Sequence, residues 1–220
     1  MGKLIVIEGL DGSGKATQTK LLCERLESEG VKLLKVSFPD YESDSSALVR
    51  MYLSGKFGDH PDDVNAYAAS SFYAVDRYAS FKANWKKQYD KGYVIIADRY
   101  ATSNGIHQCS KLPEDQWVEY LNWLSDYEYV KLGIPAPDLV IYLDMSLNVS
   151  EKLLMNRYHG DETKKDIHEK DKEYLLRSRK ARRFCAEHEG WKRIKCDDGR
   201  DPYDISYISE RVIEAVKEVL

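Results

Sequence analysis

The stretch Gly9–Lys15 combines three glycines with a terminal lysine, a composition suited to binding phosphate. Glycines let successive backbone N–H groups converge on phosphate oxygens, and the start of a following helix adds partial positive charge. The lysine of such a P-loop reaches the β- and γ-phosphates of a nucleotide. The predicted ATP-binding residues are Gly9, Leu10, Asp11, Gly12, Ser13, Gly14, Lys15, Ala16 and Thr17.

Two other interpretations of this loop are less favoured. A dinucleotide-binding G-x-G-x-x-G motif needs a third glycine where Thr17 stands. A plain glycine turn is disfavoured because the motif lies between a predicted strand and a predicted helix.

The residue after the P-loop lysine is unusual. It is normally a serine or threonine that binds Mg²⁺ through its hydroxyl, whereas this chain has Ala16. Thr17 cannot simply substitute, because one residue rotates a helical position by about 100°. Metal binding is therefore expected to depend on nucleotide phosphates, water and nearby carboxylates, with these candidates: Asp11, Asp98 and Glu169.

A second candidate site is the segment Asp98–Tyr100, at the end of the third predicted strand. Open parallel sheets bind ligands at this carboxyl edge. Arg99 can hold a phosphate there through a bidentate, charge-assisted pair of hydrogen bonds. The alternative is an Asp–Arg surface pair, which contributes little; placement beside the P-loop strand favours function.

The elements that position these residues follow an alternating pattern. Five short apolar runs are separated by segments with helical spacing, which predicts βαβ units around a parallel sheet. The first four runs are apolar enough to be covered on both faces, and the last is predicted to be an edge strand. The runs are Leu4–Ile7, Leu33–Phe38, Tyr93–Ala97, Leu139–Leu143 and Trp191–Lys195. The predicted class is an α/β, P-loop NTPase-type, doubly wound five-stranded parallel sheet with flanking helices, in one domain spanning 1–220.

Three helices and a lid are also predicted. One runs from Lys15 to Gly30, and another begins near Val149 after a cap at Ser146 or Asn148. A long helix covers Val64–Gln88. Its aromatic stripe fits either the core of one chain or a dimer face; the stripe includes Tyr67, Ala74, Tyr78, Phe81 and Trp85. The charged segment 157–172 fits a solvated surface or a mobile lid over a phosphate site.

Composition excludes several other classes. The net charge of −4 argues against binding a nucleic-acid polymer, which needs a basic face. The four cysteines form no CxxC pair, so zinc and disulfides are not expected. No apolar run approaches the roughly 18 residues of a membrane span, and no signal peptide is seen. A cytoplasmic location is the expectation.

Taken in order, several motifs resemble those of thymidylate kinases over essentially the whole chain. The order and spacing carry the resemblance, since each motif alone is weak. The motifs are Glu8–Lys15, Phe38–Tyr41, Asp76–Arg77, Asp98–Tyr100 with Ser103–Asn104, and Pro137–Leu139 leading into Tyr142–Asp144.

The resemblance implies roles on the acceptor side. Asp11 corresponds to a contact with the sugar 3′-hydroxyl, and Arg99 to the residue that holds the acceptor phosphate. Arg77 would read a base carbonyl, while Tyr73, which shares its helix face, would stack on the base in preference to Phe72. The implied substrate-binding set is Asp11, Phe38, Tyr41, Tyr73, Arg77, Arg99, Ser103, Asn104, His107, Asp166 and Glu169.

The resemblance also places a catalytic cation in the lid. Some family members carry a basic residue inside the P-loop, but this chain has Gly12 there. The lid is therefore expected to supply the charge that stabilises the transferring phosphoryl group; its candidates are Arg157, Lys164 and Lys165. The implied catalytic set is Lys15, Arg99, Asp11 and Arg157.

Three positions depart from the family pattern. His107 stands where a tyrosine usually crowds the sugar 2′ position, His168 replaces a common aromatic residue, and Asp40 stands where many members have an arginine. The residue at position 107 therefore bears on selectivity for 2′-deoxy sugars, and the histidines are expected to shape the substrate site without acting as general bases.

The predicted function is transfer of the ATP γ-phosphoryl group to dTMP, with Mg²⁺, to give dTDP. The partners are small nucleotides and, as the resemblance implies, a second copy of the chain in a homodimer. One alternative is a deoxynucleoside kinase, in which Asp40 would act as the base for a hydroxyl acceptor. The other is a noncatalytic nucleotide-binding module, motivated by Ala16.

Overall fold

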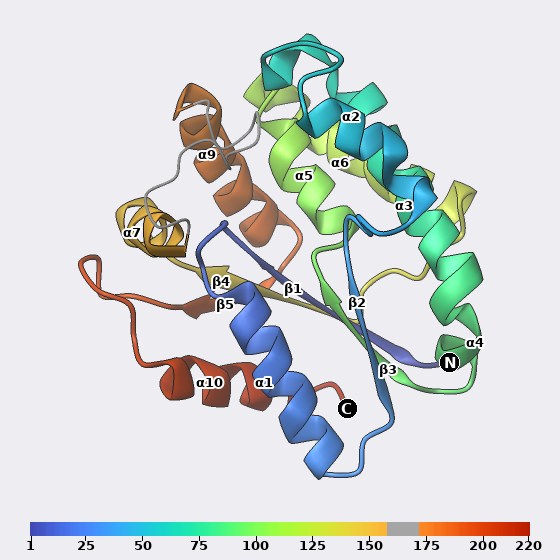
Figure 1. The fold of residues 1–220 in the computed structure, drawn as a ribbon, viewed down its shortest axis with the longest axis vertical. Helices are drawn as coiled ribbons and strands as arrows, with labels where there is room; N and C mark the ends of the chain where they lie inside the picture. The colour runs from blue at the N-terminus through green and yellow to red at the C-terminus, as the bar shows by residue number, and fades with distance from the viewer. Residues whose placement is uncertain (158–171) are drawn as a thin grey trace.

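The fold is a parallel five-stranded sheet with helices on both faces (Figure 1). The computed structural model describes residues 1–157 and 172–220; the side chains at positions 156, 157 and 172 also fall outside that description. The strand order is β2-β3-β1-β4-β5. The strands are β1 (Lys3–Gly9), β2 (Leu33–Ser37), β3 (Val94–Asp98), β4 (Leu139–Asp144) and β5 (Lys192–Lys195). The predicted fold class is confirmed.

Strand β1 lies at the centre of the sheet and is buried on both faces. Its partners place Ile7 beside Asp98 of β3 and Gly9 beside Leu143 of β4. This register brings the P-loop and the Asp98–Tyr100 segment to the same carboxyl edge. Asp138 fastens the other end, accepting hydrogen bonds from the Leu4 backbone (2.8 Å) and the Lys3 ammonium (2.9 Å).

The prediction for β2 is wrong in one respect. It was expected to be covered on both faces, but it is the second edge strand, and Lys35 and Ser37 are exposed. Apolar composition in a run this short does not separate an edge strand from an inner strand. The edge position predicted for β5 is confirmed.

The helices on the two faces of the sheet enclose two separate hydrophobic cores. Alternate β1 residues face opposite ways: Ile5 packs with helices α1 and α10, whereas Leu4 packs with Phe81 and Trp85. Helices α3, α5, α6 and α9 form the other layer, visible above the sheet in Figure 1. The helices are α1 (Lys15–Ser28), α2 (Ala47–Leu53), α3 (Ala66–Ser80), α4 (Lys86–Asp90), α5 (Ala101–Cys109), α6 (Trp117–Ser125), α7 (Leu147–Arg157), α9 (Lys172–His188) and α10 (Ile205–Lys217).

The predicted long helix exists but is not uniform. Helices α3 and α4 are joined by a π-helical turn at Phe81–Trp85. Phe81 and Trp85 are buried in the chain's own core, so they are not available as a dimer face. Tyr67 and Tyr78 of the same stripe are more than a third exposed.

The observed boundaries of two helices differ slightly from the predicted ones. Helix α1 ends at Ser28, and Gly30 follows with a φ of 80°, a conformation that favours glycine. Helix α7 begins at Leu147, directly after Ser146, whose hydroxyl has no hydrogen-bond partner in the described chain and so does not cap it. Within the described residues, no helix is long and apolar enough to cross a membrane.

Candidate active site

The P-loop connects β1 to α1 as predicted. Gly12 and Gly14 have φ values of 82° and 85°, which side-chain-bearing residues rarely adopt. A Cβ on Gly12 would also lie 2.4 Å from the carbonyl oxygen of Ser150 on α7. The Lys15 ammonium is buried and donates to the carbonyl oxygens of Gly9 (3.1 Å) and Leu10 (2.8 Å). The loop therefore holds its lysine folded inward.

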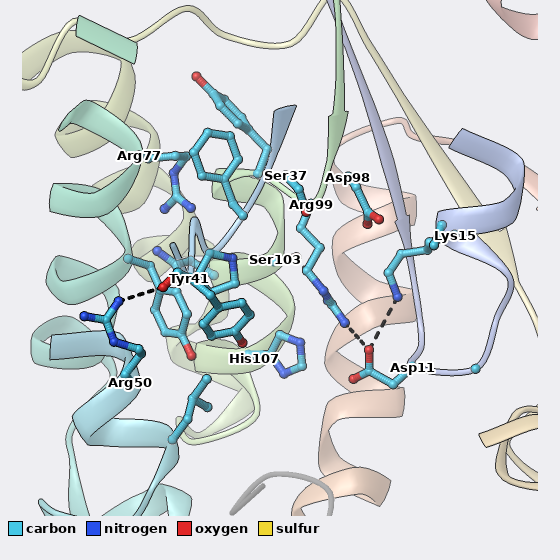
Figure 2. Close-up of a pocket in the computed structure, with 18 of the residues that line it drawn as sticks. Asp11, Lys15, Ser37, Tyr41, Arg50, Arg77, Asp98, Arg99, Ser103 and His107 are labelled. Carbon is cyan, nitrogen blue, oxygen red and sulfur yellow. Dashed lines mark hydrogen bonds and ion pairs between the residues drawn. The ribbon is translucent and has the colours of Figure 1, made fainter. Parts of the chain in front are cut away.

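Two cations converge on one carboxylate at the mouth of this loop. Arg99 Nη2 donates to Asp11 Oδ1 at 2.5 Å, and Lys15 Nζ lies 3.6 Å from the same oxygen (Figure 2). Arg99 itself has a φ of 66°, a left-handed conformation that is rare for a non-glycine residue. Three residues that were predicted from two separate motifs thus meet at one place in the structure.

A buried carboxylate that the sequence reasoning missed supports Arg99. Glu8 is fully buried at the end of β1 and accepts hydrogen bonds from Thr102 (2.6 Å) and Ser103 (2.8 and 3.0 Å). The Ser103 hydroxyl in turn accepts a bond from Arg99 Nη1 at 3.3 Å. A charged residue ending an otherwise apolar strand was the available signal. Ser103, which is itself bonded to Glu8, therefore helps to hold the Arg99 side chain in place.

The three charges at the loop perturb one another. Burial raises the pKa of Asp11, but the charges of Arg99, Lys15 and His107 outweigh it, so the pKa is lowered. Burial and the charge of Arg99 lower the pKa of Lys15. Burial also opposes charge on Arg99, yet neighbouring carboxylates, led by Asp11 and Glu8, raise its pKa. Asp11 and Arg99 therefore stay ionised at neutral pH.

A cavity of about 880 Å³ opens from the P-loop towards α3 and α5. This size is ordinary for a small-molecule site. Almost all of the predicted site residues that the structure describes lie on its wall: Asp11, Gly12, Gly14, Lys15, Ala16, Thr17, Phe38, Tyr41, Tyr73, Arg77, Asp98, Arg99, Ser103, Asn104 and His107. Phe72 is not on the wall, whereas Tyr73 is.

Arg77 forms the far wall of the cavity, opposite Asp11 (Figure 2). It makes a bidentate ion pair with Glu128, of which the Nε–Oε2 distance is 3.0 Å, and both side chains are almost fully buried. The guanidinium also lies 5.9 Å from the Phe38 ring centroid and 5.7 Å from that of Tyr100. The sequence did not indicate a role for Glu128, because the surrounding π-helical segment, Asp126–Lys131, has the composition of polar surface.

Helix α5 presents amides to the cavity. Asn104 donates to the Ser70 carbonyl (3.3 Å) and approaches Glu128 Oε1 (3.4 Å). Gln108, one turn later, is fully buried and lines the cavity, yet neither atom of its amide has a partner in the described chain. A buried amide without partners is costly, which makes Gln108 a candidate contact for a ligand. The i, i+4 spacing from Asn104 could have found Gln108 from the sequence.

His107, also on α5, lies on the same cavity wall, on the side towards Asp11 (Figure 2). Its Nδ1 is 3.1 Å from the Tyr174 hydroxyl, which also donates to the His107 carbonyl at 3.2 Å, and the two rings stack at 6.2 Å. Tyr174, on α9, is completely buried. Tyr174 therefore holds the imidazole of His107 in place on the cavity wall.

The loop after β2 is fixed by Asp76, the buried neighbour of Arg77. Its carboxylate accepts from the Asp40 backbone (2.9 Å) and the Ser45 hydroxyl (2.6 Å). Arg50, a further wall residue that sequence reasoning missed, donates to the Tyr41 carbonyl at 2.9 Å. Asp40, the base expected for a hydroxyl acceptor, is not on the cavity wall, whereas its neighbours Pro39 and Tyr41 are.

The donor set fits magnesium only in part. The described residues contain no cluster of three or more possible metal ligands. Asp98 lies on the cavity wall, whereas the Asp11 carboxylate is already paired with two cations. One carboxylate with nucleotide phosphates and water is a common way to hold Mg²⁺.

The lid predictions lie outside the described residues. They concern the side chain of Arg157 and residues Lys164, Lys165, Asp166, His168 and Glu169. Their roles stay predictions.

The fold and its loop define a P-loop phosphotransferase. A family model described as "Thymidylate kinase" matches residues 7–198, and the chain belongs to that family. The thymidylate kinase of Mycobacterium tuberculosis is 30% identical over 178 residues, covering 80% of this chain and 81% of that protein. A probable thymidylate kinase of Pyrococcus horikoshii is 33% identical over 165 residues, covering 75% of each. The structure of thymidylate kinase from Candida albicans shares the fold, with a TM-score of 0.72 at 21% identity over 99% of this chain and 92% of that chain.

Proposed function

We propose that the chain transfers the γ-phosphoryl group of ATP to dTMP. The observation that carries this proposal is the convergence of Lys15 and Arg99 on Asp11, where the P-loop meets the acceptor cavity. Lys15 serves the donor phosphates and Arg99 the acceptor phosphate. The acceptor oxygen is already ionised, so catalysis needs alignment and neutralisation of charge but no strong base.

The acceptor lies along the cavity between Arg99 and Arg77. Its phosphate binds Arg99, its sugar 3′-hydroxyl binds Asp11, and its base reaches Arg77 and Asn104, with Tyr73 on one ring face. The chemistry that Mg²⁺ would supply here is neutralisation of charge on the donor phosphates. Because Ala16 offers no hydroxyl, carboxylates are proposed to hold the metal: Asp98 among the described residues, and Glu169 of the lid as a further candidate.

The test is an acceptor panel. Release of ADP is measured by a coupled assay with ATP, Mg²⁺ and either dTMP, dUMP, UMP or thymidine. We expect turnover with dTMP and none with thymidine. Absence of dTMP-dependent ADP release would contradict the proposal, and turnover of thymidine alone would favour a deoxynucleoside kinase. The UMP arm tests whether His107 excludes a 2′-hydroxyl.

Gln108 is proposed to bind the edge of the base. Replacing it with leucine keeps the volume and removes both amide groups, so the KM for dTMP should rise about tenfold, as expected for one or two lost hydrogen bonds. Steady-state kinetics measures this. Gln116→Leu, at a position beyond α5 and away from the cavity, is the control. An unchanged KM would remove Gln108 from the site.

The remaining proposals concern organisation. We propose one domain over 1–220 with residues 157–172 as a lid, a cytoplasmic location, and a homodimer. Tyr67, Val75 and Tyr78 are exposed on α3 and form a plausible apolar dimer face. Sedimentation equilibrium on the wild type and Tyr78→Lys tests the dimer; a wild-type monomer at micromolar concentration would contradict it.

A further inference from the structure

A second cavity, of about 270 Å³, lies where α9 crosses the carboxyl ends of β4 and β5. Its wall carries cations and carboxylates together with the start of α7: Asp144, Ser146, Arg179, Arg182, Arg183, Glu187, Arg193, Lys195, Asp197 and Asp198. None of these residues is used in the phosphoryl transfer described above.

The carboxylates of this cavity are already engaged. Asp144 pairs with Arg193, and Glu187 pairs with Arg183 at 2.9 Å. Asp197 accepts the backbone N–H groups of Ser146 (2.6 Å) and Gly199 (2.7 Å). Asp198 accepts two further backbone N–H groups, from the loop after β5. Arg193 and Arg183 thus neutralise Asp144 and Glu187, whereas the neutral backbone N–H groups do not neutralise Asp197 and Asp198. These two acids offset only part of the charge of Arg179, Arg182 and Lys195.

Arg182 is the exceptional residue. It is only 3% exposed, yet within the described chain its guanidinium makes no hydrogen bond or ion pair. The guanidinium carbon lies 5.9 Å from the centroid of the Tyr142 ring. Burying a guanidinium costs free energy that is normally recovered by a carboxylate partner. Burial also lowers the pKa of Arg182, and the charge of Asp144 only partly offsets this effect.

Two further features give the cavity affinity for anions. Arg179 and Lys195 are exposed on its wall and likewise make no ion pair with a described residue. The buried hydroxyl of Ser146 has no partner in the same part of the chain. Helix α7 starts at the next residue, but its N-terminus is already capped by Asp197, which accepts the Ser146 N–H at 2.6 Å.

We propose that this cavity binds a phosphate-bearing anion the size of a diphosphate, held by Arg182, Arg179, Lys195 and the Ser146 hydroxyl. A planar guanidinium with five donors matches phosphate oxygens, and an anion would supply the charge that Arg182 lacks. The cavity is smaller than the roughly 300–1,000 Å³ of drug-sized sites, which favours a diphosphate over a whole nucleotide.

The experiment titrates inorganic pyrophosphate into the full chain by calorimetry. A non-hydrolysable ATP analogue and dTMP are present at saturation, so that the donor and acceptor positions are filled. We expect one pyrophosphate to bind under these conditions. Loss of binding when the two nucleotides are present would overturn the proposal, because the cavity would then be part of the donor site.

Variants identify the residues. Arg182→Met and Lys195→Met should each weaken pyrophosphate binding at least tenfold. Lys180→Met, on the same helix but paired with Glu114 away from the cavity, should not. Lys195 is exposed, so its variant decides the question even if Arg182→Met does not fold. Binding that is unchanged in Lys195→Met and in any folded Arg182→Met, or no binding to the wild type, would also overturn the proposal.

Discussion

Replacing Arg99 with methionine is expected to lower kcat/KM for dTMP by about 10³-fold or more. Arg99 is proposed to hold the acceptor phosphate next to the transferring phosphoryl group, and arginines that neutralise charge in such a transition state contribute on this scale. In this chain Arg99 is fixed by Asp11 on one side and by Ser103 and Glu8 on the other, so its charge is already in place before substrate arrives. Preorganised charge of this kind stabilises the transition state without reorganisation.

Arg99→Lys separates charge from geometry. It keeps the positive charge but loses the bidentate fork, so its activity should lie between the methionine variant and the wild type. Steady-state kinetics with dTMP and ATP measures both variants, and thermal unfolding shows whether they are folded. Arg25→Met, at an exposed pair with Glu29 on α1, is the matched control and should have wild-type kinetics. Wild-type kcat/KM in Arg99→Met would refute the assignment.

The features that could be predicted were those written in local sequence. The glycines of the P-loop, the apolar strand runs and the strand-end position of Arg99 depend on neighbours in the chain, and the parallel sheet then forces the strand ends together. Even so, the coverage on both faces that was predicted for β2 was wrong. Whether a strand lies at the edge depends on pairing across the sheet and not on the apolar content of one run.

The supporting residues could not be predicted because their partners are distant in sequence. Glu8 meets Ser103 across 95 positions, and Arg77 meets Glu128 across 51. Glu128 faces inward through a π-helical segment, which shifts side chains away from the helical period that a sequence pattern assumes. Composition treats such a glutamate as solvated surface, whereas the fold uses it as the counter-charge of a binding arginine.

Glu128→Ala is expected to destabilise the protein by about 3–5 kcal/mol, because it leaves the Arg77 guanidinium buried without its partner. The midpoint of urea unfolding measures this loss. Any folded Glu128→Ala should also show a raised KM for dTMP, since Arg77 loses the contact that fixes it on the cavity wall. Glu128→Gln keeps the shape and one acceptor, so its effect should be smaller.

The double variant Arg77→Met/Glu128→Met tests whether the pair is retained for stability or for binding. Removing both charges avoids the unpaired ion, so the double variant should be less destabilised than Glu128→Ala alone, and it can approach the wild type. Its KM for dTMP should nevertheless be raised, because the guanidinium that contacts the base is gone. Stability losses that simply add would mean that Arg77 and Glu128 are not coupled in the fold. A double variant with wild-type KM would mean that Arg77 does not read the base. A stable double variant with impaired dTMP binding would show that the ion pair is kept for recognition despite its cost to the core.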